Sequence, residues 1–291
     1  MANILIIGCG DIGTRCARLL LPKHRIFALA RSVATAYGLR AEGIVPIPGD
    51  LDQMASLQRL AGIADGVLHF APPSPAGSHD LRTRKLLSVL GKQAILPRRL
   101  VYISTSGVYG DCGGAVIDET RTPHPQSARG VRRLDAETQV RNWGRRLGIA
   151  TPIVRVPGIY ALDRLPLDRL RQGTPVLCAE DDVFTNHIHA DDLAMIAVHA
   201  LRFGQAGRAY HASDDSALKM GDYFDRVASA FGLPYPPRIS RTEAETSLPA
   251  SRLSFMQESR RMSNTRIKHE LRVRLHYPDV DTTLNAKHPA D

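Results

Sequence analysis

The sequence predicts an α/β fold, in which a doubly wound parallel β-sheet is followed by a smaller C-terminal α+β lobe. The first observation behind this prediction is that short apolar segments alternate with helical or turn segments in the N-terminal part of the chain. Because these segments are apolar throughout, they are typical of strands that helices cover on both faces. The second observation is a glycine-rich turn directly after the first segment. The predicted strands are residues 3–7, 25–30, 44–48, 66–71 and 99–103.

The glycine-rich turn, with the spacing G-x-G-x-x-G, leads into a helix that Pro22 ends. In this setting Gly8 allows a tight turn, Gly10 lets the backbone approach a pyrophosphate, and Gly13 lets the helix pack on the strand. Backbone N–H groups and the positive end of the helix dipole favour phosphate there. The turn therefore predicts a dinucleotide site, and an ordinary strand-to-helix turn is the alternative. Its predicted cofactor contacts are Gly8, Cys9, Gly10, Asp11, Ile12 and Gly13.

The end of the second strand favours NADP over NAD as the cofactor. Arg31 and Ser32 stand where an NAD site would usually place an acidic residue for the ribose 2′-hydroxyl. An arginine and a hydroxyl would instead bind a 2′-phosphate, and Arg15 could add a second cation. A solvated strand end is the alternative interpretation of Arg31.

The third and fourth strands end in further candidate contacts. Asp50, in the sequence Gly-Asp-Leu, could accept a hydrogen bond from an adenine amino group, or it could cap a helix over residues 52–60. The adjacent Leu51 belongs to the same predicted site. Ala71 and Pro72 lie at the carboxyl edge of the sheet, where such folds bind ligands.

Composition places the chain among ordinary globular proteins, with 43% apolar and 23% charged residues. No apolar run reaches the roughly 18 residues of a membrane span, and we expect no signal peptide and no membrane partner. The four cysteines are scattered without a C-x-x-C pair, which indicates a reducing cytoplasm and no structural metal site. The net charge is +9, but no nucleic-acid motif accompanies it, so we expect no nucleic-acid partner.

Several motifs then give the chain a family resemblance. They are GDL at 49–51, STSGVYG at 104–110, VPGIY at 156–160 and HIHADDL at 187–193, in addition to the glycine turn. In this order they resemble the short-chain dehydrogenase/reductase superfamily in its extended form, which is similar to NAD-dependent epimerases and dehydratases, and most of all the atypical YeeZ-like proteins. The resemblance implies a Rossmann lobe over 1–160, completed by 186–204, and a substrate lobe over 161–185 and 205–291.

The resemblance also implies catalytic positions. Thr105 aligns with the Ser or Thr that hydrogen-bonds the reacting oxygen. The family carries Tyr-x-x-x-Lys on the next helix, expected here over residues 126–147, but this chain places Arg129 and Arg133 there. Arg133 could still hold a ribose hydroxyl or a phosphate, whereas the guanidinium of Arg129 cannot donate a proton near neutral pH. Tyr109, Tyr160 and His124 are the candidate replacements, and simple packing is the alternative for each.

The C-terminal half offers fewer signals. His187, His189, Asp191 and Asp192 lie close together, which could suit a metal ion, but the resemblance explains them as an interlobe joint in which Asp191 or Asp192 caps a helix. Arg260 or Arg261 could clamp a phosphate or carboxylate, or belong to a solvated basic helix. We expect the residues from 280 onward to be frayed.

These features predict an NAD(P)-dependent oxidoreductase or nucleotide-sugar epimerase/dehydratase-like enzyme. Arg129 indicates an anionic small-molecule substrate, since a guanidinium pairs well with phosphate or carboxylate. The alternative is a regulatory or sensor protein that binds NADP(H) without turnover, which the missing tyrosine favours. The resemblance also allows a homodimer.

Overall fold

The computed structural model describes residues 1–92, 95–249, 253 and 256–286. A central sheet of seven strands has the order β12-β7-β5-β4-β1-β2-β3, and every neighbouring pair in it is parallel. This confirms the predicted doubly wound α/β fold. The strands are β1 (Asn3–Ile7), β2 (Arg25–Ala30), β3 (Val45–Pro48), β4 (Gly66–His69), β5 (Arg99–Thr105), β7 (Ile153–Val156) and β12 (Ala209–His211).

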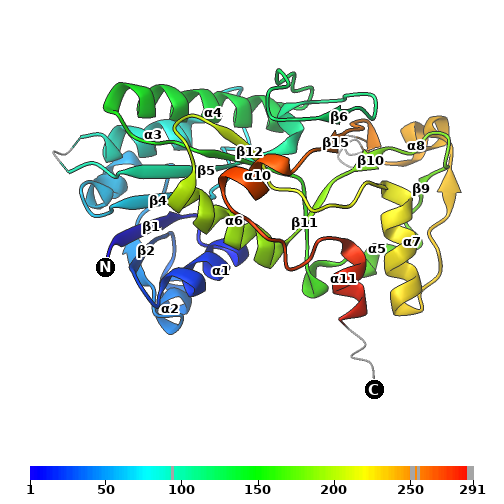
Figure 1. The fold of residues 1–291 in the computed structure, drawn as a ribbon, viewed down its shortest axis with the longest axis horizontal. Coiled ribbons are helices and arrows are strands. Elements are labelled where there is room, and N and C mark those ends of the chain that lie inside the picture. The colour runs from blue at the N-terminus through cyan, green and yellow to red at the C-terminus, as the bar shows by residue number, and fades with distance from the viewer. Residues whose placement is uncertain (93–94, 250–252, 254–255, 287–291) are drawn as a thin grey trace.

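Helices cover both faces of this sheet (Figure 1). Ile4 and Ile6 of β1 pack on one face with four helices, and Leu5 and Ile7 pack on the other with two helices and a 3₁₀ turn. Successive strand residues point to opposite faces, so a strand that is apolar throughout joins both cores. The helices of the first face are α1 (Asp11–Leu20), α2 (Val33–Ala41), α6 (Ala190–Phe203) and the short α10 (Thr265–Glu270). Those of the second are η1 (Met54–Leu60), α3 (Leu81–Leu90) and α4 (Ala128–Leu147).

Side-chain caps set where several of these helices begin. The side chains of Ser32, Asp80 and Ser127 accept backbone N–H groups at the starts of α2, α3 and α4. Gly148, in the left-handed region with φ +68°, ends α4. The segment predicted as a helix over 52–60 is instead the 3₁₀ turn η1, which begins only at Met54.

The smaller lobe is built from short helices and two-stranded ladders on the right of Figure 1. Its second helix, α7 (Met220–Phe231), has the bounds that the sequence predicts. The ladders pair β6 (Val116–Ile117) with β15 (Arg261–Met262), β8 (Gly158–Tyr160) with β11 (His187–His189), β9 (Val176–Leu177) with β14 (Arg238–Ile239), and β10 (Phe184–Thr185) with β13 (Leu218–Lys219). The remaining elements are η2 (Ser106–Val108), η3 (Leu162–Arg164), α5 (Leu167–Arg171), α8 (Arg241–Ser247) and α11 (Val280–Asn285).

The expectation of a frayed C-terminus is wrong for the last of these elements. Asp279 accepts the backbone N–H of Thr282 and caps α11. Val280 and Leu284 are buried in the core of the smaller lobe together with α7. Two apolar side chains on one face of a single helical turn were enough to hold this segment, although its composition is polar. Residues 287–291 lie outside the described residues.

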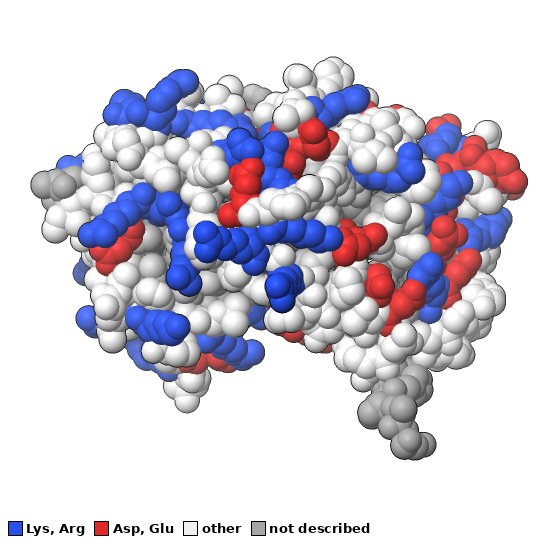
Figure 2. Space-filling view, viewed as in Figure 1, with Lys and Arg blue, Asp and Glu red and all other residues white. Residues whose placement is uncertain are grey.

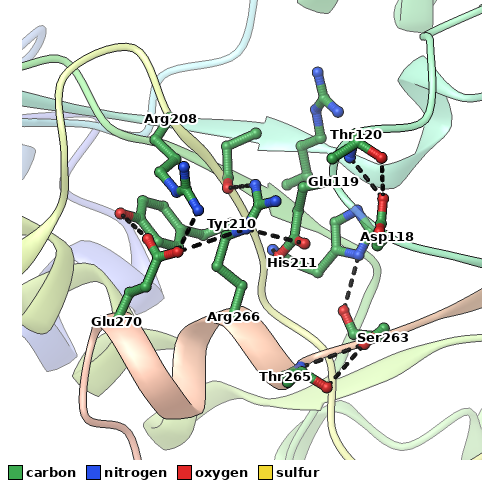
Figure 3. Close-up of polar contacts among 12 residues, drawn as sticks. Asp118, Glu119, Thr120, Arg208, Tyr210, His211, Ser263, Thr265, Arg266 and Glu270 are labelled. Atoms are coloured by element: carbon green, nitrogen blue, oxygen red, sulfur yellow. Dashed lines mark hydrogen bonds and ion pairs between the residues drawn. The ribbon is translucent and has the colours of Figure 1, made fainter.

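The predicted lobe boundary needs a correction at β12. Residues 205–291 are predicted to belong to the smaller lobe, but Ala209–His211 form the seventh strand of the large sheet and pair with β7. Figure 3 shows how the chain fixes this edge: Arg266 of α10 lies 3.4 Å from a Glu119 oxygen and donates to the Ala209 carbonyl. Glu119 also accepts the backbone N–H of His211 at 3.0 Å. Long-range polar contacts thus attach a C-terminal strand to the N-terminal domain.

Lys and Arg side chains dominate the larger lobe on the face in Figure 2, whereas acidic and basic side chains mix over the smaller lobe. The net charge of +9 is therefore unevenly distributed on this face. Within the described ranges, every helix is too short or too polar to cross a lipid bilayer.

Candidate active site

A cavity of about 680 Å³ lies between the carboxyl edge of the sheet and the smaller lobe. The glycine turn, the end of β5 and the start of α4 form its wall on the Rossmann side. Segments of the smaller lobe close it from the other side, including Arg164, Arg169, Tyr223, Glu258 and Arg260. This is the position that an open parallel sheet provides for ligands, because the strands end there and the loops diverge.

The surroundings of the three glycines agree with the steric demands that their spacing predicts. Gly8 has φ +83°, and a Cβ atom there would lie 2.6 Å from the Ala71 nitrogen. A Cβ on Gly13 would lie 3.2 Å from the Gly8 carbonyl oxygen and from Ile6 Cγ2, so helix and strand pack closely there. A Cβ on Gly10 would meet no atom within 4 Å, so its approach side is open to the cavity.

The residues of this turn fit a pyrophosphate. Gly10 occupies the N-cap of α1, where no side chain accepts the N–H groups of the first helical turn. Unsatisfied N–H groups at a helix N-terminus bind anions well. Asp11 and Ile12 line the cavity beside the glycines, whereas the neighbouring Cys9 is half-buried, and burial raises the pKa of its thiol to about 11. Cys9 is therefore a neutral thiol near neutral pH.

The proposed contribution of Arg15 to the 2′-phosphate site is corrected by the structure. Its Nε donates to Asp11 at 2.8 Å, and its Nη1 donates to Asp191 at the start of α6. Both partners are carboxylates, so the positive charge of Arg15 is already balanced within the protein. Arg15 therefore joins α1 to α6 and is not positioned as a cation for the cofactor.

Arg31 and Ser32 lie at the carboxyl end of β2, as the sequence predicts. Arg31 is exposed, and the Ser32 hydroxyl accepts the Thr35 N–H at the start of α2. Asp52 is the acidic residue nearby, and a hydrogen bond from Arg82 lowers its pKa, with smaller contributions from Lys85 and Arg31. Arg82 pairs with Asp52 and balances the negative charge of that carboxylate. The end of β2 therefore remains compatible with a 2′-phosphate.

The other predicted cofactor residues differ in their roles. Asp50 accepts the Asp52 N–H at 2.9 Å and closes a tight turn, so it does not cap the 3₁₀ helix, whose N-cap is Gln53. A contact with adenine stays a prediction. Leu51 is buried in the core. The carbonyl groups of Ala71 and Pro72 accept hydrogen bonds from arginines of α4 and α3, which brings both helices to this edge of the sheet.

Thr105 and both arginines of the altered motif line the cavity. Thr105 Oγ1 accepts the Gly107 N–H at 3.2 Å at the end of β5. Arg133 Nη1 donates to the Ile103 carbonyl at 2.9 Å and to the Tyr102 hydroxyl at 3.1 Å. Arg129 stands one helical turn earlier, at the mouth of the cavity. The structure thus brings together Thr105, Arg129 and Arg133, which are far apart in the sequence.

Tyr109 is not in the cavity, and its predicted catalytic role is corrected. Its side chain is buried, and its hydroxyl contacts His211 Nε2 and accepts from Arg155 Nη1, both at 2.6 Å. Burial raises the pKa of Tyr109 to about 12. Glu137 of α4 accepts two hydrogen bonds from Arg155, at 2.8 and 3.1 Å. Tyr109 therefore belongs to a buried polar chain that ties the β5 loop to α4.

The other two candidate proton donors differ in position, since Tyr160 lines the cavity with a buried ring and His124 does not line it. The Tyr160 ring is buried and contacts the rings of His187 and His189 edge-on, and burial raises the pKa of its hydroxyl. His124 is exposed and lies outside the cavity lining. The cavity contains two acidic residues instead, Asp11 and Glu258. Glu258 carried no distinctive sequence signal, since its distance along the chain from Thr105 follows no short motif.

The interlobe joint exists, but its cap is not an aspartate. His189 Nδ1 accepts the Asp191 N–H and caps α6, and burial lowers the pKa of this imidazole, which favours the neutral acceptor form. Asp192 is buried and accepts the backbone N–H groups of His276 and Tyr277, at 2.9 and 2.8 Å. Among the described residues no group of three or more His, Cys, Asp or Glu side chains is arranged to hold a metal ion.

Comparison with known proteins shows the same fold. YeeZ of Escherichia coli K12 is 24% identical over 96% of this chain and 97% of its own length. A functionally unknown conserved protein from Silicibacter pomeroyi is similar in structure, with a TM-score of 0.83, 28% identity and 98% of both chains covered. The UDP-glucuronic acid 4-epimerase of Bacillus cereus, solved with UDP-glucuronic acid and NAD, has a TM-score of 0.77 at 18% identity, covering 98% of this chain and 97% of that one.

A family model provides the assignment. It matches residues 4–213, which include the glycine turn, Thr105, the arginine pair of α4 and the interlobe joint. This match covers well over half of the 291 residues. The chain belongs to the NAD dependent epimerase/dehydratase family.

Proposed function

We propose that the protein is an NADP(H)-dependent oxidoreductase or epimerase/dehydratase-like enzyme that acts on an anionic small molecule, such as a nucleotide sugar or a carboxylate. The observation that carries the proposal is the single cavity in which the open glycine turn, Thr105 and several arginines meet. Five arginines and two acidic residues line that cavity, so positive charge is in excess. An anionic substrate would be attracted there by charge complementarity.

The chain's own residues divide the work of such a reaction. When bound, the nicotinamide supplies hydride chemistry, and the protein orients the reactants. The glycine turn and the N-terminus of α1 would hold the pyrophosphate, and Arg31 with Ser32 would hold a 2′-phosphate. Thr105 Oγ1 already accepts the Gly107 N–H, so its own hydrogen can donate to a substrate oxygen. Arg129 would hold the anionic group of the substrate.

The four scattered cysteines, all free, also support a cytoplasmic location.

Titration of the protein with NADPH and NADH tests the nucleotide preference. Arg31→Asp should weaken NADPH binding by roughly 10- to 100-fold, because a charged hydrogen bond contributes about 1.5–3 kcal/mol. NADH binding should change little. Arg40→Asp, which makes the same charge change at the exposed far end of α2, is the matched control. Equal affinity of the wild-type protein for both nucleotides would contradict the preference for NADP.

A screen of nucleotide sugars and small carbonyl compounds, followed by the absorbance of the reduced nicotinamide, tests turnover. With any substrate found, Thr105→Ala should lower kcat by roughly 10²- to 10³-fold, since one preorganised donor to the reacting oxygen is lost. Thr105→Ser keeps the hydroxyl and should retain most of the rate. If Thr105→Ala is as active as the wild type, Thr105 does not polarise the substrate.

A regulator that binds NADP(H) without turnover is the second candidate. Arg129 favours it, because the position of the family's tyrosine holds a side chain that cannot exchange a proton near neutral pH. Tight NADPH binding without turnover of any compound in the screen would support this candidate. Failure to bind either nucleotide would contradict both.

A further inference from the structure

The cavity needs a group that can take up and return a proton, and the arginine at position 129 cannot do so. General acid–base chemistry requires a side chain within hydrogen-bond reach of the reacting oxygen. Asp11, one of the two acidic residues in the lining, lies on the glycine turn, where Arg15 and Arg164 bind its two oxygens at 2.8 and 2.7 Å. Glu258 lies at the opposite wall, beside the loop that carries Thr105.

Glu258 and Thr105 both line the cavity, and atoms of both side chains lie near the same position beside Gly107. That position is the place of a Cβ atom on Gly107, which lies 3.6 Å from Thr105 Oγ1 and 3.9 Å from Glu258 Oε2. Because residue 107 is glycine, no side chain fills this space. The two oxygens therefore lie close together on either side of Gly107, and a substrate hydroxyl packed against Gly107 would lie between them. The absence of a side chain at Gly107 therefore leaves room for a reacting group between a hydroxyl and a carboxylate.

The carboxylate of Glu258 is held in place by Arg260. Arg260 Nη1 lies 2.9 Å from Glu258 Oε2 and donates to the Gly110 carbonyl, also at 2.9 Å. Arg260 Nη2 donates to Ser106 Oγ at 3.2 Å. The Arg260 side chain thus ties Glu258 to the residues on both sides of Gly107, and both side chains of the pair are largely buried.

Backbone contacts fix the same segment. The Ser259 N–H donates to Asp111 Oδ1 at 2.8 Å, and the Ser259 hydroxyl accepts the Phe184 N–H at 3.0 Å. The chain then enters β15, which pairs with β6. Glu258 is therefore presented by a segment that is anchored directly after it, through Ser259, Arg260 and β15. Such preorganisation is what a group in a reaction centre requires.

We propose that Glu258 is the catalytic base, in place of the tyrosine that this chain lacks, and that Arg260 is its positioning residue. This inference rests on the proposed function. In the oxidation of a substrate alcohol, the O–H bond breaks and its proton passes to the Glu258 carboxylate. At the carbon that carries this oxygen, the C–H bond breaks and a C=O bond forms. The hydride from that carbon reduces the oxidised nicotinamide nucleotide. In the reverse direction the Glu258 carboxylic acid returns the proton to the oxygen while the reduced nucleotide returns the hydride.

The test compares Glu258→Gln with Glu245→Gln, a control that neutralises an exposed carboxylate on α8 of the same lobe. With a substrate from the screen and saturating nucleotide, Glu258→Gln should lower kcat by roughly 10²- to 10⁴-fold, whereas the control should not. NADPH affinity should be unchanged in both variants, which would show that the fold and the cofactor site are intact.

Two further readouts separate catalysis from a structural role. Formate should restore part of the turnover of Glu258→Ala, because a small carboxylate can occupy the vacated space. Turnover of the wild-type protein should fall toward low pH as its base becomes protonated, and this decline should be lost in Glu258→Gln. If the wild-type protein turns over a substrate and Glu258→Gln is equally active, the assignment of Glu258 alone is overturned. The same holds if formate does not rescue the rate of Glu258→Ala and the pH profile of Glu258→Gln matches that of the wild type. A wild-type protein that binds NADPH but turns over no compound would overturn the proposed function and this assignment together.

Discussion

Replacement of Glu137 by leucine is expected to lower the free energy of unfolding by about 3–5 kcal/mol, because it leaves a buried arginine without its anion. Glu137 is fully buried, and Arg155, only 2% exposed, binds both of its oxygens. Arg141 lies 3.1 Å from the same carboxylate. In the variant the Arg155 guanidinium would keep Tyr109 as a neutral partner but would have lost its buried countercharge.

Urea unfolding monitored by the fluorescence of Trp143, the sole tryptophan, measures this loss. Trp143 is buried on α4, on the same helix as Glu137, so its emission reports the relevant region. The double variant Glu137→Leu with Arg155→Met should recover much of the stability, since no buried charge then remains unpaired. Asp168→Ala, which breaks the exposed pair with Arg171, is the control and should cost less than about 1 kcal/mol. A similarly small effect for Glu137→Leu would contradict the role of the buried pair.

Alanine at Gly8 should destabilise the fold and weaken nucleotide binding, whereas alanine at Gly10 should weaken binding alone. At Gly8 the backbone has φ +83°, and the new Cβ would lie 2.6 Å from the Ala71 nitrogen, a backbone atom. The left-handed conformation costs an alanine about 1 kcal/mol, and overpacking adds about 1–3 kcal/mol. At Gly10 a Cβ meets no protein atom within 4 Å, but it would stand where the pyrophosphate approaches.

Urea unfolding and NADPH titration of the two variants separate these effects. We expect Gly10→Ala to unfold within about 0.5 kcal/mol of the wild type, as substitutions without steric conflict usually do. Its affinity for NADPH should nevertheless fall. If Gly10→Ala binds NADPH as tightly as the wild type, the pyrophosphate does not lie over this turn, and the glycine pattern would be structural only.

The parts of the fold that follow from local sequence were predictable. The strand, glycine turn and helix at the N-terminus form as the spacing of the three glycines indicates, because the left-handed turn at Gly8 and the close contact of Gly13 with Gly8 and Ile6 arise among neighbouring residues. The bounds of α7 were also predictable, since an apolar periodicity is followed by Gly232, which ends the helix in the left-handed region with φ +60°. The resemblance then located Thr105, Arg129 and Arg133, and the structure places all three in one cavity.

Errors arose where a side chain has a partner from a distant part of the chain. Arg15 was predicted as a cofactor contact, but Asp191 of α6 binds it. Tyr109 was predicted as a catalytic residue, but Arg155 and His211 bind its hydroxyl in the core. A local pattern identifies the type of side chain and its element, but not which charges from other elements will reach it.

The sequence by itself determined the fold class, the dinucleotide turn and the absence of the family's tyrosine, because these depend on backbone sterics, apolar periodicity and residue identity. Only the tertiary structure decided that β12 completes the large sheet, that α11 packs against α7, and that Glu258 lies beside Thr105. The physical reason is that burial and charge pairing depend on distances in space, and the folding of the smaller lobe onto the sheet sets those distances.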